Sequence, residues 1–245
     1  MKSLIKFSVI AVIGLSTIFT FSCKREEVSN SKNGILKEKS IPILCFYKTV
    51  KDTDGNVYKT VVIGTQTWMA SNLKTTHFND GTDIPTSGRF TPCYHWYNDN
   101  ILNKTTYGAL YNWAAASSGK LAPKGWHVAS NNEWSILINF LGGKDIAGGK
   151  LKEKGTIHWL SPNTGATNSY CFTGLPAGCI MYQGAPYQGL GTNAYFWTSS
   201  PWDSSDPSAP YFAWYRFLNY NNTSTTPSNL YITKDACFSI RCIKD

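Results

Sequence analysis

The segment between residues 107 and 143 constrains the fold more than any other, because it joins two helical patterns through a short apolar stretch. Its first part carries apolar side chains at spacings of three and four, which predict one face of a helix. These side chains are Tyr107, Leu110, Tyr111, Trp113 and Ala114. Gly119 predicts the end of that helix, because glycine readily takes the left-handed conformation found at helix C-termini. Residues 126–128 follow a Pro-Lys-Gly turn and are predicted to form a buried strand.

A second helix is predicted to begin at Ser130. Glu133 lies three residues further on, and this Ser-x-x-Glu spacing is typical of a capping box. Gly142 and Gly143 predict the end of the helix. Between the cap and the two glycines, apolar residues recur at helical spacing: Trp134, Ile136, Leu137, Phe140 and Leu141.

The rest of the chain alternates short apolar stretches with turn residues, a pattern typical of β-strands. The Asp-Gly pair at residues 54–55 predicts a hairpin between residues 49–51 and 57–63. Further strands are expected at residues 67–70, 93–97, 172–176, 195–199, 211–218 and 237–243. The predicted fold class is therefore α+β, with two helices packed on a twisted, mostly antiparallel sheet with long loops.

Residues 1–22 have the pattern of a bacterial export signal. Lys2 and Lys6 precede a largely apolar stretch at residues 8–21, which is shorter than the roughly 20 apolar residues that a membrane span needs. A small residue directly precedes Cys23, as in lipoprotein signals, so we expect Cys23 to be acylated and to anchor the chain in outer-membrane lipid. An ordinary secretory signal followed by a chance cysteine is the alternative.

Residues 23–40 are polar and charged without periodicity, and are predicted to form a flexible tether. The remaining residues 41–245 suit a single folded domain. The Lys-Arg-Glu-Glu run at residues 24–27 resembles the charged tag that directs such lipoproteins to the outer face of the outer membrane. The predicted location is therefore the outer membrane, at the cell surface.

The net charge gives no indication of a nucleic-acid partner. The chain has 23 basic and 15 acidic residues, a formal charge of +8. Residues 1–40 hold seven of the basic and three of the acidic residues, which leaves 16 basic and 12 acidic residues in the predicted domain. That domain is only about +4 and its lysines are mostly scattered, so an extended basic surface is not expected.

Several blocks carry a resemblance to a known family. They run in order from residue 52 to residue 245 and include VYKTVVIGTQTWMASNLKTTHFNDGTDIP, YGALYNW, PKGWHVASNNEW, AGGKLKE, SPNTGATN, FTGLPAG and FSIRCIKD. The chain resembles the Fibrobacter succinogenes major paralogous domain family, which is common in surface lipoproteins of Bacteroidetes-type bacteria. The resemblance implies a C-type lectin-like fold similar to that of formylglycine-generating enzymes. It implies no particular activity.

Six cysteines remain besides Cys23, and an even number in an exported chain predicts disulfides. They are Cys45, Cys93, Cys171, Cys179, Cys237 and Cys242. Relatives commonly carry a cysteine just before the Pro-x-Gly-Trp turn, where this chain has Ala122, so the resemblance implies that Cys242 lacks its partner. It also indicates Cys171 and Cys237 as an added pair, and leaves Cys179 to pair with Cys45 or Cys93 or to stay free.

No metal site and no catalytic residue is predicted. The sequence has no CxxC motif and no Cys/His cluster with ligand spacing. Cys237 and Cys242 are five residues apart, like a reactive cysteine pair, but the resemblance makes Cys242 structural, and strand alternation would turn the two side chains to opposite faces. His127 is expected to be a hydrogen-bonded structural histidine. A carboxylate pair for glycoside hydrolysis, drawn from Asp145, Glu153, Asp203 and Asp206, is not indicated by any spacing.

No cofactor is expected, although calcium stays open as an alternative. Lectin-like domains often bind calcium through loop oxygens, and this chain offers Asp203, Asp206, Asn193, Asn219, Asn221 and Asn222. The EPN and QPD signatures of sugar-binding C-type lectins are absent.

Aromatic residues in Gly-, Ser- and Asn-rich loops are the best binding candidates: Tyr182, Tyr187, Trp202 and Tyr220. Such rings stack on sugar faces and serve as anchors at interfaces. Trp197, Trp214 and Phe217 are expected to fill the core instead. The predicted function is non-catalytic binding or adhesion, with an extracellular glycan or protein as the partner. The alternative is an enzyme of the lectin-like fold, a formylglycine-type oxidase or a glycan-active hydrolase, which free thiols or paired carboxylates in a pocket would favour.

Overall fold

The computed structural model describes Cys45, residues 47–225 and residues 231–245. The predicted export signal, the tether and Cys23 lie outside the described residues. Pro42–Asp245 forms one unit by its internal contacts.

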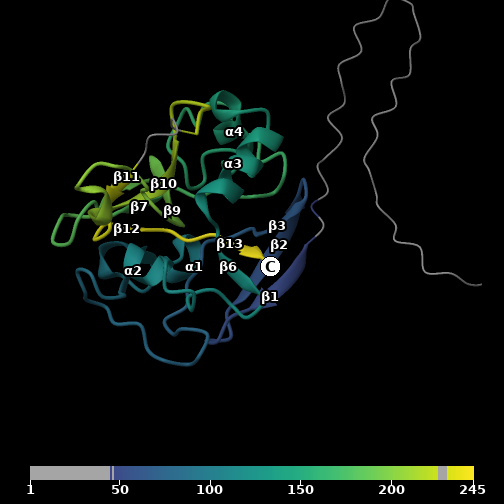
Figure 1. The fold of residues 1–245 in the computed structure, drawn as a ribbon. Helices are drawn as coiled ribbons and strands as arrows, with labels where there is room; N and C mark the ends of the chain where they lie inside the picture. Colours follow the sequence, from purple (N-terminus) through teal and green to yellow (C-terminus); the bar gives the residue numbers. More distant parts are fainter. Residues whose placement is uncertain (1–44, 46, 226–230) are drawn as a thin grey trace, which may run out of the picture. The chain divides into compact units, whose positions relative to one another are not determined.

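The two ends of the domain meet in a five-stranded antiparallel sheet (Figure 1). Its order is β1 (Lys48–Lys51), β2 (Val57–Ile63), β3 (Gln66–Met69), β13 (Cys242–Lys244) and β6 (Trp126–Val128). Strand β13 pairs with both of its neighbours through Ile243, which lies opposite Trp68 on β3 and His127 on β6. The predicted first hairpin and the strand at residues 126–128 are thus confirmed.

A second five-stranded sheet forms the other side of the core. Its order is β11 (Tyr231–Thr233), β10 (Phe212–Asn219), β9 (Asn193–Pro201), β7 (Ala177–Cys179) and β8 (Gln188–Leu190), and only β7 and β9 run parallel. A small third sheet has β5 (Leu110–Asn112) between β12 (Cys237–Phe238) and β4 (Tyr94–His95). The predicted single sheet is therefore wrong in its detail, because the strands are short and divide among three sheets.

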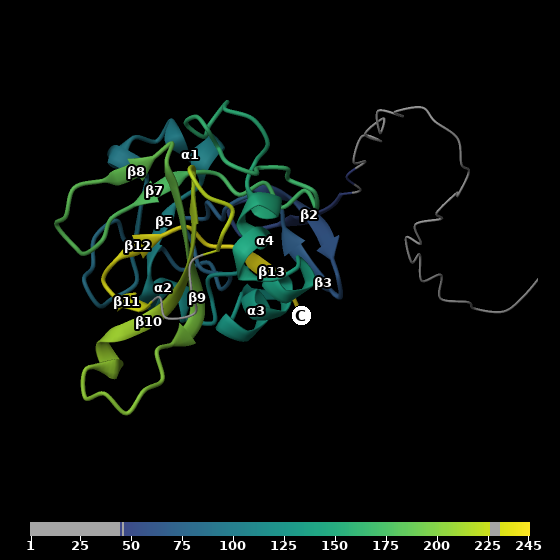
Figure 2. The same cartoon turned by 90° about the horizontal axis from the view of Figure 1, so that it is seen from above.

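Four α-helices accompany the sheets: α1 (Asn103–Tyr107), α2 (Trp113–Ala116), α3 (Asn131–Phe140) and α4 (Lys144–Leu151). The capping box at the start of α3 is confirmed, since Ser130 Oγ accepts a hydrogen bond from Glu133 N while the Glu133 carboxylate accepts one from Ser130 N. Figure 2 shows α3 and α4 lying beside β9. The α+β class is confirmed, with two short helices more than predicted.

The helix predicted to start at Tyr107 is wrong, because a strand interrupts it. Gly108 has a φ of +74° and lies so close to Leu73 O that a Cβ would stand 2.7 Å from that oxygen. Leu110–Asn112 then forms backbone hydrogen bonds with strands on both sides, and all three residues are buried. Long-range pairing thus overrides local helical periodicity.

Two other expected strands also differ. Residues 172–176 form a loop, in which Thr173 has a positive φ angle, as Cys171 does before it. Gly174 makes a single bridge to Lys152, and strand β7 begins only at Ala177. The strand expected at residues 237–243 is divided into β12 and β13, because Ile240 and Arg241 turn into the core between them.

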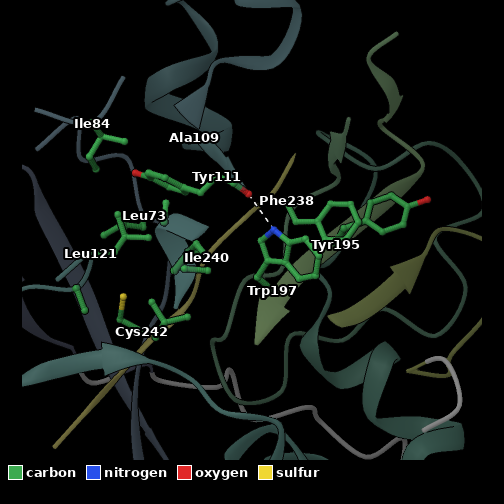
Figure 3. Close-up of a cluster of buried hydrophobic side chains, with 14 of the residues drawn as sticks. Leu73, Ile84, Ala109, Tyr111, Leu121, Tyr195, Trp197, Phe238, Ile240 and Cys242 are labelled. Atoms are coloured by element: carbon green, nitrogen blue, oxygen red, sulfur yellow. Dashed lines mark hydrogen bonds between the residues drawn. The ribbon is translucent and has the colours of Figure 1, made fainter. Parts of the chain in front are cut away.

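Aromatic rings from all three sheets fill the main core (Figure 3). The Trp197 indole donates to Tyr111 O over 2.9 Å, and its ring packs against Phe238 at 4.6 Å between centroids. The hydroxyl of Tyr111 donates to Thr75 O over 2.7 Å, so this buried phenol is satisfied. Trp197 thus fills the core as predicted.

Arg241 is fully buried and ties the loop at residues 171–173 to the first sheet. Its Nε donates to Asn72 Oδ1 over 2.8 Å, and its Nη1 donates to Met69 O and Phe172 O over 2.9 and 2.6 Å. Its Nη2 donates to Thr173 O over 2.8 Å. Every partner is a neutral oxygen, so the side chain acts as a hub for groups that would otherwise be unpaired.

Within the described residues, a disulfide joins Cys45 to Cys171. The expected pairing of Cys171 with Cys237 is therefore wrong, and Cys179 is free, as are Cys93, Cys237 and Cys242. Sequence spacing could not select this pair, because Cys171 reaches Cys45 only through the turn that Arg241 stabilises.

We expect the Cys45→Ser, Cys171→Ser double variant to unfold at lower denaturant concentration than the unmodified protein. The bond closes a loop of 126 residues, and losing such a constraint costs about 2–5 kcal/mol. Urea unfolding followed by tryptophan fluorescence measures the difference. A change below about 0.5 kcal/mol would contradict a stabilising role for this bond.

The His127 ring lies between two carboxylates, with Nδ1 2.6 Å from Asp245 and Nε2 2.8 Å from Glu133. Partial burial lowers the pKa of His127, but the two carboxylates outweigh that effect and raise the pKa above its usual value. The protonated ring therefore stabilises the folded state below pH 6.5, and this contribution is lost as the pH rises through the higher folded-state pKa.

We expect the stability difference between the unmodified protein and His127→Gln to be larger at pH 5.5 than at pH 9. The difference at low pH should be about 0.5–1 kcal/mol, since the pairs are partly exposed. Urea unfolding of both proteins at each pH measures it. An equal difference at the two pH values would mean that the charge on His127 contributes nothing.

Candidate functional site

The four predicted binding residues lie in separate parts of the structure. Trp202 follows β9 and Tyr220 follows β10, so they lie at opposite ends of the β9–β10 hairpin. Tyr182 and Tyr187 lie together in the β7–β8 connection. The predicted residues therefore do not form a single surface.

Trp202 is part of a cluster of rings outside the buried core. Its ring stacks on Tyr231 with centroids 3.8 Å apart and an angle of 10°. Phe212 and Trp214 contact Tyr231 edge-on at 5.4 and 6.3 Å. We name Trp202, Phe212, Trp214 and Tyr231 the aromatic patch. None of them belongs to the three buried clusters of the described residues.

The alternation of β10 explains why these rings stay outside. Phe212, Trp214, Arg216 and Leu218 share one face of the strand. Helix α3 covers the part of this face at Arg216, whose Nη2 donates to the Asn131 side-chain oxygen over 2.6 Å. Phe212 and Trp214 precede Arg216 in the strand and lie beyond the start of the helix, and Figure 2 shows the β9–β10 loop projecting away from α3. The prediction that Trp214 fills the core is therefore wrong.

A second place combines thiols with an imidazole at the edge of the third sheet. Cys93 and His95 come from the β4 segment, where positions two apart share a face. Cys237 comes from β12, on the other side of β5. One ligand-type atom from each of the three residues lies within 4.8 Å of the other two. We name Cys93, His95 and Cys237 the thiol cluster.

The backbone around the thiol cluster is held from the central strand. Asn112 on β5 pairs with Cys237, and its Oδ1 accepts from Cys93 N over 3.1 Å. Its backbone N–H donates to Cys93 O over 3.2 Å. One residue therefore fixes both cysteines, and the same Oδ1 also caps α2 through Ala115 N.

The three side chains change one another's acidity. The hydrogen bond with Cys237, reinforced by the nearby His95 ring, lowers the pKa of the Cys93 thiol well below its usual value. The same hydrogen bond, together with burial, raises the pKa of Cys237. The pKa of His95 is raised by its hydrogen bond with Cys93. The cluster thus favours one thiolate beside one imidazolium, the arrangement of a reactive cysteine.

A pocket of about 180 Å³ opens on the thiol cluster. Asp99, Tyr187 and Asp235 line it together with the three reactive side chains. The Tyr187 hydroxyl donates to Asp99 over 2.5 Å, and Arg89 Nε donates to Asp235 over 3.1 Å. Tyr187, predicted as a ligand-binding residue, therefore lies in the wall of this pocket.

The sequence prediction missed the thiol cluster because it required ligands at fixed local spacing. A weak signal was present, since Cys93-x-His95 in a strand directs both side chains to one face. The third member is distant in the chain, and only the pairing of β12 with β5 brings Cys237 near. Cys179 and Cys242 lie in apolar surroundings, where burial raises the pKa of both thiols.

The oxygen atoms considered for calcium fall into two groups at opposite ends of the β9–β10 hairpin. Asp206 binds Ser208 N and Oγ in the β9–β10 loop, at the other end of the hairpin from Asn219. The carbonyls of Asn219 and Asn222 accept hydrogen bonds from the buried Lys152 ammonium over 2.9 and 2.8 Å. The positive charge that these backbone oxygens surround is therefore that of Lys152.

Two of the carboxylates considered for hydrolysis have other partners. Glu153 pairs with His158 at 2.9 Å, and Asp206 caps its own loop. Cys237 and Cys242 belong to different buried clusters and do not face a common pocket.

Comparison with known proteins gives one match. The family model described as the Fibrobacter succinogenes major domain matches residues 61–244. No curated protein and no solved structure matches the chain. Among the residues that the structure describes, none of the helices is long and apolar enough to traverse a bilayer.

We expect methyl methanethiosulfonate to modify Cys93 before Cys179 or Cys242 in the folded, metal-free protein at pH 7. Cys93 faces the pocket and its pKa is lowered, whereas the other two thiols are enclosed and their pKa values are raised. Peptide mapping by mass spectrometry at increasing times measures the order. Modification of Cys242 first would contradict this account of the pocket.

Proposed function

This chain belongs to the Fibrobacter succinogenes major domain family, and from that premise we propose that it is a lipid-anchored recognition domain that binds an extracellular glycan through the aromatic patch. The proposal includes the C-type lectin-like fold implied by the resemblance. It also includes acylation of Cys23 and a position at the outer surface of the outer membrane, for which the sequence of residues 1–27 is the support.

The observation that carries the proposal is the group of large rings outside the buried core. Tyr231 is 40% exposed, and the neighbouring Tyr211 is 63% exposed. Exposed apolar surface of this kind commonly marks an interaction site on a soluble domain. The rings pack on one another, so they are rigid before a ligand arrives, and little conformational entropy is lost on binding.

Glycans fit this surface better than an extended apolar ligand. Aromatic faces stack on the C–H faces of sugars, while neighbouring polar groups bind the hydroxyls. The loop beside Trp202 has the sequence Asp-Ser-Ser-Asp at residues 203–206, and all four residues are exposed. A protein partner is the alternative within the same class of function.

The enzyme alternative receives support from one place only. The thiol cluster brings free thiols to a pocket, which is the feature expected of a thiol-dependent site. A formylglycine-type mechanism would need Cys237 and Cys242 together, and Cys242 is enclosed in the main core.

We expect Trp202→Ala to weaken glycan binding at least tenfold, which corresponds to about 1.4 kcal/mol. The Trp202 ring covers one face of Tyr231 and has only its other face left for stacking on a sugar, and alanine removes that ring. A glycan array followed by titration calorimetry with the best ligand measures the loss.

Tyr182→Ala is the matched control, since this ring is 58% exposed but lies in the β7–β8 connection. Its binding should equal that of the unmodified protein. If Tyr182→Ala loses binding and Trp202→Ala does not, the site is on the other loop. Binding to no glycan, together with capture of a partner protein that depends on Trp202, would favour the protein alternative.

A further inference from the structure

We propose that Cys93, His95 and Cys237 bind one soft metal ion, Zn²⁺ or Cu⁺, with an open coordination position facing the pocket. This site is separate from the aromatic patch and does not depend on the proposed recognition function.

The spacing of the three side chains suits one ion. Their ligand atoms lie within 4.8 Å of one another. Bonds of about 2.3 Å to sulfur and 2.0–2.1 Å to nitrogen place the ligands of a tetrahedral ion roughly 3.5–3.8 Å apart. The cluster therefore needs to close by at most about 1.3 Å, within the reach of small side-chain rotations.

Two thiols and one imidazole also select the kind of metal. Thiolate and imidazole ligands favour Zn²⁺ and Cu⁺, whereas Ca²⁺ and Mg²⁺ require oxygen ligands. On binding, two protons leave the cluster for solvent, one from the Cys237 thiol and one from the pair of Cys93 and His95, as the two sulfurs and the imidazole nitrogen bond to the metal. Two thiolates then neutralise a Zn²⁺ ion completely and leave a Cu⁺ site with one negative charge.

A second layer of contacts orients the histidine. His95 Nδ1 lies 3.4 Å from Asp99 Oδ1, which leaves Nε2 for the metal. Asp99 is held in turn by the Tyr187 hydroxyl at 2.5 Å. Ligating histidines usually direct their second nitrogen to a carboxylate in this way, which fixes the ring.

His95 and Cys237 lie in strands β4 and β12, and Cys93 directly precedes β4. Asn112 binds the Cys93 backbone and pairs with Cys237, while Ile180 exchanges two backbone hydrogen bonds with Cys237 at 2.8 and 3.1 Å. Such support preorganises a metal site, because the ligands do not have to be collected from flexible segments.

The open position distinguishes this site from a structural zinc site. Structural sites use four protein ligands, whereas reactive sites keep three and leave the fourth position to water or substrate. Within the described residues the cluster provides three ligands, and the pocket of about 180 Å³ has room for water or a small ligand. The bound ion would therefore be accessible to small molecules.

The competing chemistry is a disulfide between Cys93 and Cys237. Loss of two electrons and two protons to an external oxidant would form that bond, and the two sulfurs would no longer be metal ligands. The experiment has to separate these two states, because both would remove the free thiols.

The test uses the full chain, prepared anaerobically and incubated with Zn²⁺, Co²⁺ or Cu⁺ in separate arms. We expect one equivalent of metal after desalting, and with Co²⁺ a thiolate charge-transfer band in the near ultraviolet. Alkylation and peptide mapping should show that bound metal protects Cys93 and Cys237. Uptake of Cu⁺ but not Zn²⁺ would identify the ion as Cu⁺.

Variants make the assignment specific. Cys93→Ser, His95→Gln and Cys237→Ser should each weaken metal binding by more than 100-fold, and Asp99→Asn by about 10-fold, since it acts through His95. Cys179→Ala is the matched control and should bind as the unmodified protein does. Melting temperatures of the metal-free variants show whether they fold.

Three results would overturn the proposal. These are the absence of stoichiometric metal in every arm, a Cys93–Cys237 disulfide in the protein as isolated from its native cells, and metal uptake that the three ligand variants leave unchanged. The first two are measured on the unmodified protein, so they decide the matter even if a variant fails to fold.

Discussion

The burial of one guanidinium group is the constraint on which most of this structure depends. Removing the charge of Arg241 from water is costly, and hydrogen bonds from its N–H groups to oxygen atoms offset that cost. The four oxygens come from the end of β3, from Asn72 and from Phe172 and Thr173. The carbonyls of residues 172–173 can point at the guanidinium because Thr173 takes a left-handed conformation, as Cys171 does beside it. Arg241 thus determines the path of the loop at residues 171–173, and through that loop the position of the disulfide.

Lys152 stabilises a second group of loops in the same way. Its ammonium is fully buried and donates to three backbone carbonyls, those of Thr164, Asn219 and Asn222. Burial lowers its pKa to about 8, so the group remains largely charged at neutral pH. Two internal cations therefore hold loops that lack regular hydrogen-bonded pairing. This arrangement explains how a domain with short strands and long connections keeps a defined surface, on which the aromatic patch and the thiol pocket are placed.

Local features were predictable from the sequence, and features made by distant contacts were not. The capping box of Ser130 and Glu133 and the turn at Asp54-Gly55 depend on residues a few positions apart, and both are present as predicted. Leu110–Asn112 is helical by its spacing but lies between two strands, since pairing with Cys237 and Tyr94 outweighs local preference. The same pairing creates the thiol cluster, which no local spacing could indicate. Large rings are usually buried, so Trp214 is predicted to fill the core, and its half-buried position outside the core clusters follows only from the point at which α3 begins.

The position of the disulfide has a mechanical consequence. A pull on the chain ahead of Cys45 enters the domain at that residue and crosses directly to Cys171. If the opposing force acts at the aromatic patch, at residues 202–231, the tension runs along the chain from Cys171 onward. The segment enclosed by the bond, with β1 to β6 and all four helices, then carries none of the load along its backbone. A domain tethered at its N-terminal side can thus hold a ligand under shear without unravelling from its first strand.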